Sequence, residues 1–207
     1  MERIRLKYVS IDIETTGLDP LTCSVLEFGA ILEDTENPAG RENLPTFHKY
    51  LWRSVYAGEP FALAMNANIF WKMIELRKTE GVGGEDAYDK TLIAPDFLWL
   101  HFKHWIFQNK NLWPEGSFIN KQPTLVVAGK NVAGFDIPFV KLLPNMPKFH
   151  HRVIDPGMMY FDPRNDNVPP DLKECKKRAK LSEHVSHEAL DDAWDVIQLV
   201  REKYPLI

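Results

Sequence analysis

The stretch that decides the fold is residues 7–17, which read KYVSIDIETTG. Alternate residues of a β-strand lie on opposite faces, and here apolar side chains alternate with Ser10, Asp12 and Glu14. Asp12 and Glu14 therefore point the same way, about 6.5 to 7 Å apart along the strand. Two carboxylates in this arrangement can reach one cation site, and Gly17 permits the turn out of the strand.

The rest of the chain divides into segments with strand or helix patterns. Apolar runs predict further strands at residues 25–32, 47–52, 124–129 and 153–155. Longer periods predict two helices between residues 61 and 109 separated by the glycines of 81–84, a helix near 135–143, a proline-rich loop at 162–170 and two closing helices. We therefore expect one α/β domain over residues 1–207, with a mixed sheet of an antiparallel meander plus parallel strands and helices on both faces.

Two further acidic motifs follow the first one along the chain. Residues 131–136 read NVAGFD, and residues 187–192 read HEALDD. The three motifs together offer four carboxylates and one histidine, and oxygen ligands of this kind suit Mg²⁺ or Mn²⁺ rather than a thiol-preferring metal. Because a pair of such ions can clamp a phosphodiester for in-line attack, the motifs predict a metal-dependent nuclease.

The last motif poses a geometric question. Five residues of regular helix rotate a side chain by about 140°, so His187 and Asp192 would not face one site from within the same helix. We therefore expect His187 in the loop or cap before a helix that Ser186 caps, free to approach the metals and take a proton from water. Helical spacing alone favours Asp191 as its partner, and the apolar stripe of the helix predicts that Asp191, Asp192 and Asp195 lie off the core side.

The three motifs resemble those of the DnaQ-like 3′-5′ exonucleases, the histidine-containing branch of the DEDD superfamily. The likeness runs in the family's order and implies a ribonuclease-H-like fold with two Mg²⁺ or Mn²⁺ ions held by Asp12, Glu14, Asp136 and Asp192. The family's H-x-A-x-x-D frame is filled by His187, Ala189 and Asp192, so the resemblance makes His187 the general base and selects Asp192 over Asp191. It also implies that the substrate is contacted by Thr15, Thr16, Gly17, Leu18, Asn131 and Phe135.

The resemblance implies hydrolysis of phosphodiester bonds at the 3′ end of single-stranded nucleic acid, with release of nucleoside 5′-monophosphates. DNA is the expected substrate. The alternatives are an exoribonuclease that trims RNA or degrades short oligonucleotides, and a non-catalytic nucleic-acid-binding subunit with the same fold. Family members work alone or with a polymerase, and the sequence leaves open whether a polymerase or a second copy of the chain is a partner.

Composition constrains the setting of such a site. The net charge of −4 argues against extensive duplex contact, whereas an enzyme that grips a few nucleotides at a strand end needs few phosphate contacts. No apolar run reaches the length of a membrane span or a signal h-region, so we expect a soluble, cytoplasmic protein with no membrane partner. Cys23 and Cys175 lie outside any CxxC pattern, and we expect reduced thiols.

Two groups of residues permit both a structural and a functional interpretation. The basic segment 173–180 is more typical of a solvated helix face than of a phosphate contact. The tryptophans Trp71, Trp99, Trp105 and Trp113 offer base stacking, but their helical spacing beside Phe and Leu favours core positions.

Overall fold

The centre of the molecule is a mixed β-sheet. The computed structural model describes residues 6–112 and 124–204. Within these ranges five strands form one sheet in the order β4-β3-β2-β1-β5. The strands are β1 (Lys7–Thr15), β2 (Val25–Asp34), β3 (Thr46–Leu51), β4 (Leu92–Ile93) and β5 (Val127–Ala128).

The pairing of the strands confirms the predicted meander. β1 pairs with β2, and β2 with β3, in antiparallel register, whereas the β1–β5 and β3–β4 pairs are parallel. β1 is therefore hydrogen-bonded to a strand on each side, and an interior position in the sheet is expected for a strand with two buried faces. The register shifts between Glu14 and Thr15, and such irregularities re-aim side chains next to functional sites.

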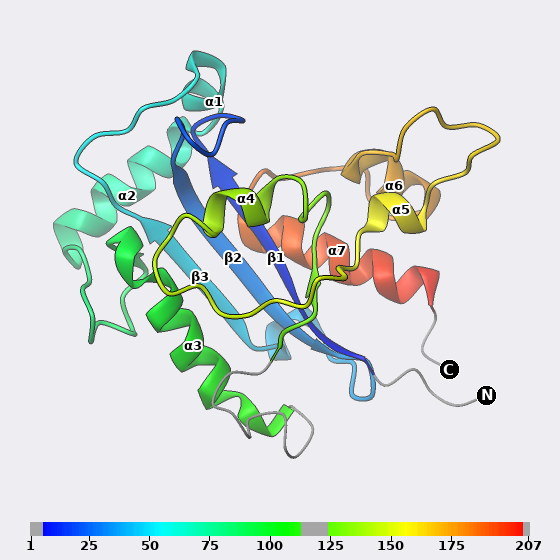
Figure 1. Cartoon of the computed structure of the whole chain (residues 1–207), viewed down its shortest axis with the longest axis horizontal. Coiled ribbons are helices and arrows are strands. Elements are labelled where there is room, and N and C mark those ends of the chain that lie inside the picture. The colour runs from blue at the N-terminus through cyan, green and yellow to red at the C-terminus, as the bar shows by residue number, and fades with distance from the viewer. Residues whose placement is uncertain (1–5, 113–123, 205–207) are drawn as a thin grey trace.

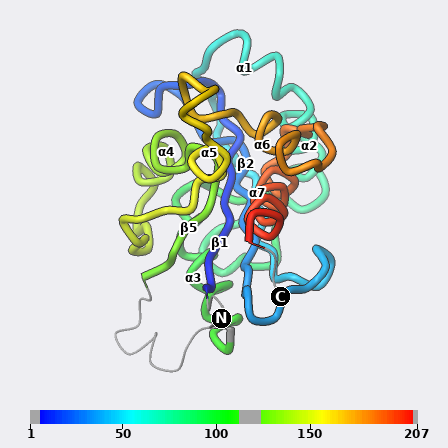
Figure 2. Tube along the Cα trace, turned by 90° about the vertical axis from the view of Figure 1, so that its right-hand side faces the viewer, coloured from blue at the N-terminus to red at the C-terminus, as the bar shows by residue number. Residues whose placement is uncertain are grey.

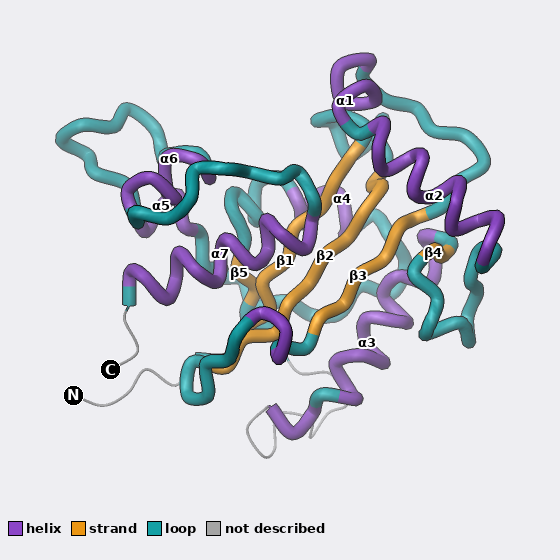
Figure 3. The backbone as a smooth tube through the Cα atoms, turned by 180° about the vertical axis from the view of Figure 1, so that it is seen from behind, coloured by secondary structure: helices purple, strands orange, loops and turns teal. Residues whose placement is uncertain are grey.

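Helices lie on both faces of the sheet, as predicted. They are α1 (Pro60–Met65), α2 (Ala67–Thr79), α3 (Leu98–Gln108), α4 (Asp136–Val140), α5 (Pro156–Met159), α6 (Leu172–Arg178) and α7 (Ala189–Lys203). Figure 1 shows α3 and α4 in front of the sheet, and Figure 3 shows α7 crossing the opposite face. Figure 2 places β1 between α4 on one side and α7 on the other. Short 3₁₀ helices occur at Arg41–Asn43, Pro95–Phe97 and Lys110–Leu112.

Each face of the sheet has its own apolar core. On the α3 face, the ring of Phe28 meets those of Trp99 and Phe102 edge-on, with centroids 5.5 and 5.9 Å apart. These three side chains are fully buried, and edge-to-face aromatic pairs stabilise a core beyond the burial of their area. On the other face, Ala193 and Ile197 of α7 pack against the sheet. The central strands are thus held rigidly from both sides.

Several sequence-based expectations need correction in detail. β4 was not predicted, because a pair of apolar residues after a glycine-rich loop carries no periodicity. The strand expected at 153–155 is a single bridge between Ala128 and Ile154. The helix expected first in residues 61–109 is two helices, α1 and α2, separated at Asn66.

The tryptophans divide between the two interpretations. Trp99 and Trp105 are core residues, as predicted, but the core prediction for Trp71 is wrong, because 68% of its surface is exposed. Trp113 lies outside the described residues. Cys23 and Cys175 are free thiols, as predicted. Across the ranges that the structure describes, no helix is long and apolar enough to cross a bilayer.

Candidate metal centre

β1 presents Asp12 and Glu14 to the face of the sheet that α7 covers. Ser10 lies on the same face, and its hydroxyl donates to the backbone oxygen of Ala193 at 2.8 Å. This bond fixes the start of α7 over β1 although 183 residues separate the partners. Glu14 is buried with 7% of its surface exposed, so its carboxylate lies in a partly desolvated site.

A glycine on the neighbouring strand allows α7 to come close. Gly29 pairs with Asp12 across the β1–β2 ladder. A Cβ at Gly29 would lie 2.6 Å from the backbone of Ala189, closer than side chains tolerate. Any larger residue would push away the first turn of α7, which carries Asp192.

His187, Glu14 and Asp192 converge at one point. One potential ligand atom from each residue lies within 4.8 Å of the other two. His187 precedes α7, has a left-handed backbone (φ 55°) and is exposed, so it stands outside the helix as predicted from geometry. Ser186 is not the N-cap of α7, because Glu188 occupies that position. The Ser186 hydroxyl instead accepts a hydrogen bond from the backbone N–H of Glu188, at 3.3 Å.

The two adjacent aspartates of the last motif have different environments. Asp191 forms a salt bridge with Arg41 of the first 3₁₀ helix. Asp192 is buried, and its Oδ1 has no hydrogen-bond partner among the described residues. The expectation that Asp191, Asp192 and Asp195 lie off the core side is therefore wrong for Asp192 and Asp195, which are both buried. The close approach of α7 to β2 buries that side of the first turn. The structure thus brings Asp192, and not Asp191, to Glu14 and His187.

Asp12 and Asp136 lie next to this group, and with Glu14 and Asp192 they form the acidic cluster. Asp136 is the first residue of α4, only 2% exposed, and its Oδ1 also lacks a partner in the described part of the chain. Burial raises the pKa of Asp12 well above its usual range, and the nearby charges of Asp136, Asp192 and Glu14 raise it further. Both aspartates therefore share the electrostatic environment of Glu14 and Asp192, although they lie outside the 4.8 Å group.

The electrostatics of the cluster are unfavourable without a cation. Burial, followed by the charges of Glu27 and Asp192, raises the pKa of Glu14 to about 8. Burial and the charge of Asp195 raise the pKa of Asp192 to about 6. Repulsion of this kind between carboxylates is relieved when a divalent cation binds. The oxygen-rich donors and the two unpartnered buried oxygens fit magnesium or manganese, and His187 adds a nitrogen.

The loop after β1 contains the other residues of the first motif. The hydroxyls of Thr15 and Thr16 both donate within the protein, to the backbone oxygens of Gly17 (2.7 Å) and Ala57 (2.6 Å). A Cβ at Gly17 would lie 2.6 Å from the Cys23 sulfur, so glycine is required for the close packing of this loop. The two threonine side chains thus shape the loop.

Leu18, Asn131 and Phe135 differ in how far their side chains are exposed to solvent. Leu18 is 72% exposed beside the acidic cluster's strand, and its backbone N–H donates to the side chain of Glu59 at 3.0 Å. Asn131 is exposed with a left-handed backbone (φ 54°), and Phe135 is half-buried against Phe139, with ring centroids 5.1 Å apart. Leu18 and Asn131 are therefore accessible, whereas only part of Phe135 is.

Sequence reasoning missed two side chains that touch the acidic cluster. Asn66 is buried and donates to the backbone oxygen of Thr15 at 2.9 Å, and a hydrogen bond from its side chain partly offsets the raised pKa of Glu14. Glu27 is the ladder partner of Glu14, is 2% exposed and contacts Nε2 of His48 at 2.5 Å. No motif marks either residue. The alternation of β2 could have placed Glu27 on the face of Glu14 once the register was known.

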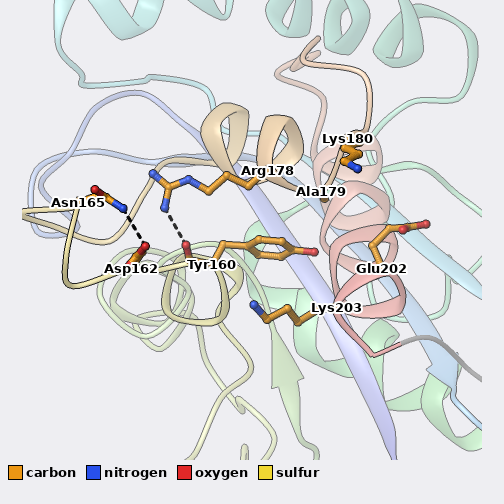
Figure 4. Close-up of a pocket in the computed structure, with 8 residues that line it drawn as sticks. All are labelled: Tyr160, Asp162, Asn165, Arg178, Ala179, Lys180, Glu202 and Lys203. Carbon is orange, nitrogen blue, oxygen red and sulfur yellow. Dashed lines mark hydrogen bonds between the residues drawn. The ribbon is translucent and has the colours of Figure 1, made fainter.

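In the part of the chain that the structure describes, one surface cavity adjoins the cluster and another lies away from it. A cavity of about 630 Å³ over β2 and β3 is lined by Glu27, His48, Glu188 and Asp191 among others. A cavity of about 700 Å³ lies between α6, the end of α7 and the loop after α5 (Figure 4). None of the residues that line the second cavity is a predicted site residue. Its volume alone is therefore no argument for a functional site there.

Several solved structures superimpose on this chain. No family model matches the chain, and a search of curated proteins also finds no match. Cell-death related nuclease 4 (CRN-4) superimposes with a TM-score of 0.60 at 16% identity, over 94% of this chain and 62% of that one. Zinc-bound E. coli exonuclease I with single-stranded DNA gives 0.55 at 16% identity, over 97% and 41%. The same exonuclease with a dT13 oligonucleotide gives 0.54 at 18% identity, over 96% and 42%.

The comparisons define the fold class. The chain spans about three fifths of CRN-4 and about two fifths of exonuclease I. At these identities the likeness is one of fold alone, and the fold is the ribonuclease-H-like mixed sheet with helices on both faces that the motifs predicted.

Proposed function

We propose that the protein is a divalent-metal-dependent 3′-5′ exonuclease that acts on single-stranded nucleic acid. One observation carries the proposal: Glu14, His187 and Asp192, which lie in two motifs far apart in sequence, offer ligand atoms within 4.8 Å of one another. The charges of Asp136, Asp192 and Glu14 add to the raised pKa of Asp12, and the charge of Asp136 also adds to that of Glu14. Four carboxylates held this close are costly to the folded state, so the cluster supports the binding of a cation.

The proposed roles follow from burial and exposure. Asp12, Glu14, Asp136 and Asp192 are the metal ligands. When bound, two Mg²⁺ or Mn²⁺ ions would supply Lewis-acid stabilisation of the negative charge that develops at the scissile phosphate. His187 is exposed beside the carboxylates and accepts the proton of the attacking water. Its place outside the helix leaves the imidazole accessible to that water.

Recognition of a strand end is assigned to the accessible residues around the cluster. Leu18 and Phe135 supply apolar surface for the terminal base, and Asn131 supplies a polar contact nearby. The loop that presents Leu18 is held by one bond within it, from Thr15 to Gly17, and by two bonds to segment 57–59, from Thr16 and from the Leu18 backbone N–H. Phe61, which is 79% exposed on α1 and lies two residues after Glu59, is a further apolar group that the sequence did not point out. Contacts of this kind with bases tolerate any sequence.

The comparisons support this assignment without carrying it. The fold is shared with a nuclease and an exonuclease, and in two of the structures exonuclease I is complexed with single-stranded DNA or an oligonucleotide. One of these structures also contains zinc. DNA is therefore the first substrate to test, with RNA and short oligonucleotides as the alternatives. The non-catalytic alternative is less favoured, because the chain retains all four carboxylates and the histidine.

A matched set of substrates tests the proposal. Single-stranded DNA, RNA and a dinucleotide, each labelled at the 5′ end, are incubated with Mg²⁺ or Mn²⁺ and with a chelator as the control. We expect stepwise shortening from the 3′ end, mononucleotide products and no reaction with chelator. A circular single strand and a strand blocked at its 3′ hydroxyl should be resistant. Efficient cutting of either would make the protein an endonuclease, and inactivity on every substrate would favour the binding subunit.

A further inference from the structure

The basic segment on α6 contains one lysine that is not solvated. Only 4% of the surface of Lys176 is exposed, whereas its neighbours Lys173 and Lys177 are exposed. Its ammonium group donates to Oδ2 of Asp195 on α7 and to the backbone oxygen of His184. The expected solvated helix face is therefore wrong at this position. A lysine is rarely buried unless its charge is paired, so the two contacts account for its burial.

The two contacts connect structures of different kinds. Asp195 lies one turn after Asp192 on the face of α7 that is buried. His184 lies three residues before His187, in segment 181–188, which is neither helix nor strand. Lys176 thus joins the helix that holds a proposed metal ligand to the segment that holds the proposed base.

Segment 181–188 has few other connections. Its other hydrogen bonds are close in sequence: Leu181 donates to the backbone oxygen of Lys176, and Ser182 and Ser186 each accept from a residue two positions later. At its end, the backbone oxygen of Glu188 accepts from the backbone N–H groups of Asp191 and Asp192 on α7. In the part of the chain that the structure describes, the Lys176–His184 contact is the one hydrogen bond that joins residues 182–187 to another element. The position of His187 therefore depends on α7, which begins two residues later, and, through His184, on α6.

α6 itself is firmly attached. Arg178 forms two hydrogen bonds with the carboxylate of Asp166, at 2.5 and 2.7 Å. It also donates to the backbone oxygen of Tyr160, as Figure 4 shows. The Tyr160 hydroxyl in turn donates to the backbone oxygen of Leu199 on α7, at 2.9 Å. α6 is thus linked to α7 directly at Asp195 and, through Tyr160, indirectly at Leu199, which makes it a rigid base for a contact to the histidine segment.

We propose that Lys176 is a positioning residue: it holds segment 181–188 so that His187 meets Glu14 and Asp192. This inference rests on the proposed function, because His187 matters for the reaction only if it accepts a proton there. Lys176 itself does not reach the reacting atoms. Its loss should slow the chemical step, because a general base displaced by about 1 Å can cost up to about 10²-fold in rate.

The variants are chosen to separate positioning from folding. Lys176→Met alone leaves Asp195 without its partner, so the decisive variant is Lys176→Met combined with Asp195→Asn, which removes both charges. Asp195→Asn alone keeps the lysine and its contact with His184. Lys173→Met removes an exposed lysine from the same helix and is the matched control. Thermal melting identifies the temperature at which every variant is folded, and all rates are measured there.

Activity on a single-stranded oligonucleotide gives the first readout. We expect kcat of the double variant to fall about tenfold to 10²-fold with KM within about twofold. Asp195→Asn should lose much less, and Lys173→Met should match the parent. In a His187→Ala background the double substitution should have no further effect on kcat, because the base that it positions is absent. An equal fractional loss in both backgrounds, or no loss in either, would overturn the proposal.

Hydrogen exchange gives a second readout that needs no nuclease activity. In the double variant the backbone amides of residues 182–188 should exchange at least about tenfold faster, while those in the second half of α7 keep their protection. Unchanged exchange in 182–188 would overturn the positioning role even if the rate fell. Faster exchange in a protein that degrades no nucleic acid would retain the contact's structural role and refute the proposed function instead.

Discussion

Strand β1 and segment 181–188 supply parts of the same site but are held in different ways. β1 is hydrogen-bonded to β2 along its whole length and to β5 at Val9 and Ser10, and it is covered on both faces, so Asp12 and Glu14 have little freedom. Segment 181–188 is irregular, and it is joined to α7 at Glu188 and to α6 by the bond from Lys176 to His184. His187 stands on it with a left-handed backbone.

The difference matches the work proposed for each region. Carboxylates that repel one another must be held by the scaffold before a cation arrives, and a paired strand supplies that rigidity. A base that exchanges protons with water has to remain accessible, which a buried strand does not allow. We therefore expect substitutions in β1 to remove activity outright, and those in segment 181–188 to alter its rate and pH dependence.

The largest effect is expected at the rigid carboxylates. Asp12→Asn or Glu14→Gln should lower kcat by about 10³-fold or more, because bound metal supplies several kcal/mol of transition-state stabilisation. The fold should persist, since removing one charge from a crowded cluster lowers repulsion. Steady-state rates with Mg²⁺ and circular dichroism of the metal-free variants check both points. Full activity of Asp12→Asn would remove β1 from the site.

The two aspartates of the last motif give a comparison within one helical turn. Asp192→Asn should be nearly inactive, with a loss similar to that of Glu14→Gln. Asp191→Asn removes the salt bridge with Arg41, which is half-exposed and should matter little for the rate. Measuring both variants with the same substrate decides between the resemblance and simple helical spacing. The opposite ranking would mean that the last motif has been aligned incorrectly.

His187→Ala tests the part of the site that lies on the irregular segment 181–188. A general base contributes typically about 10²- to 10⁴-fold to rate and little to binding, so kcat should fall within this range while KM stays close to that of the parent. The acid limb of the pH-rate profile should also flatten, because protonation of the imidazole no longer removes the base. Rates between pH 5 and 9 show the change. A profile identical to the parent's would assign the proton acceptor to another group.

The pH dependence of stability tests the burial and mutual repulsion of the carboxylates of Glu14 and Asp192. The folded-state pKa of Glu14 is about 8 and that of Asp192 about 6, both above the ordinary values of 4.5 and 3.8. A raised pKa means that the folded state binds more protons, so the free energy of unfolding is highest below about pH 4 for these groups and falls as the pH rises toward 8.

Denaturant unfolding with a chelator present measures this slope. The loss from pH 5 to 8 should be a few kcal/mol at most, since one pKa unit corresponds to about 1.4 kcal/mol. Mg²⁺ should restore stability most at the upper end of the range. Glu14→Gln should flatten the slope in the metal-free protein. Stability that rises over this interval without metal would contradict the assigned shifts.

The smallest effect is expected at Leu18, where we propose that the 3′ end of the nucleic acid binds. Leu18→Ala removes exposed apolar surface beside the cluster, and contacts with single bases are worth about 1 to 3 kcal/mol. KM for a single-stranded oligonucleotide should rise, while kcat at saturation changes little. Leu21→Ala, in the same loop and 81% exposed, is the control. An equal rise in KM for both variants would indicate general loop damage rather than a contact from Leu18.

Local patterns in the sequence were enough for part of this description. The alternation of residues 7–17 predicted a strand with Asp12 and Glu14 on one face, and helix geometry alone placed His187 outside α7. Both conclusions depend only on neighbours in the chain, because the periods of strands and helices are properties of the backbone. The mixed sheet with helices on both faces also followed from the succession of patterns.

Other features depended on contacts between distant residues. The burial of Asp192 needs Gly29 on β2, the pairing of Asp191 needs Arg41, and the burial of Lys176 needs Asp195 on α7. In each case two surfaces meet whose sequences carry no periodic sign of each other. The amino-acid sequence by itself determined which side chains are available and which face of their own element they occupy. Only the tertiary structure decided which of them are desolvated together, because desolvation depends on what packs from the other side.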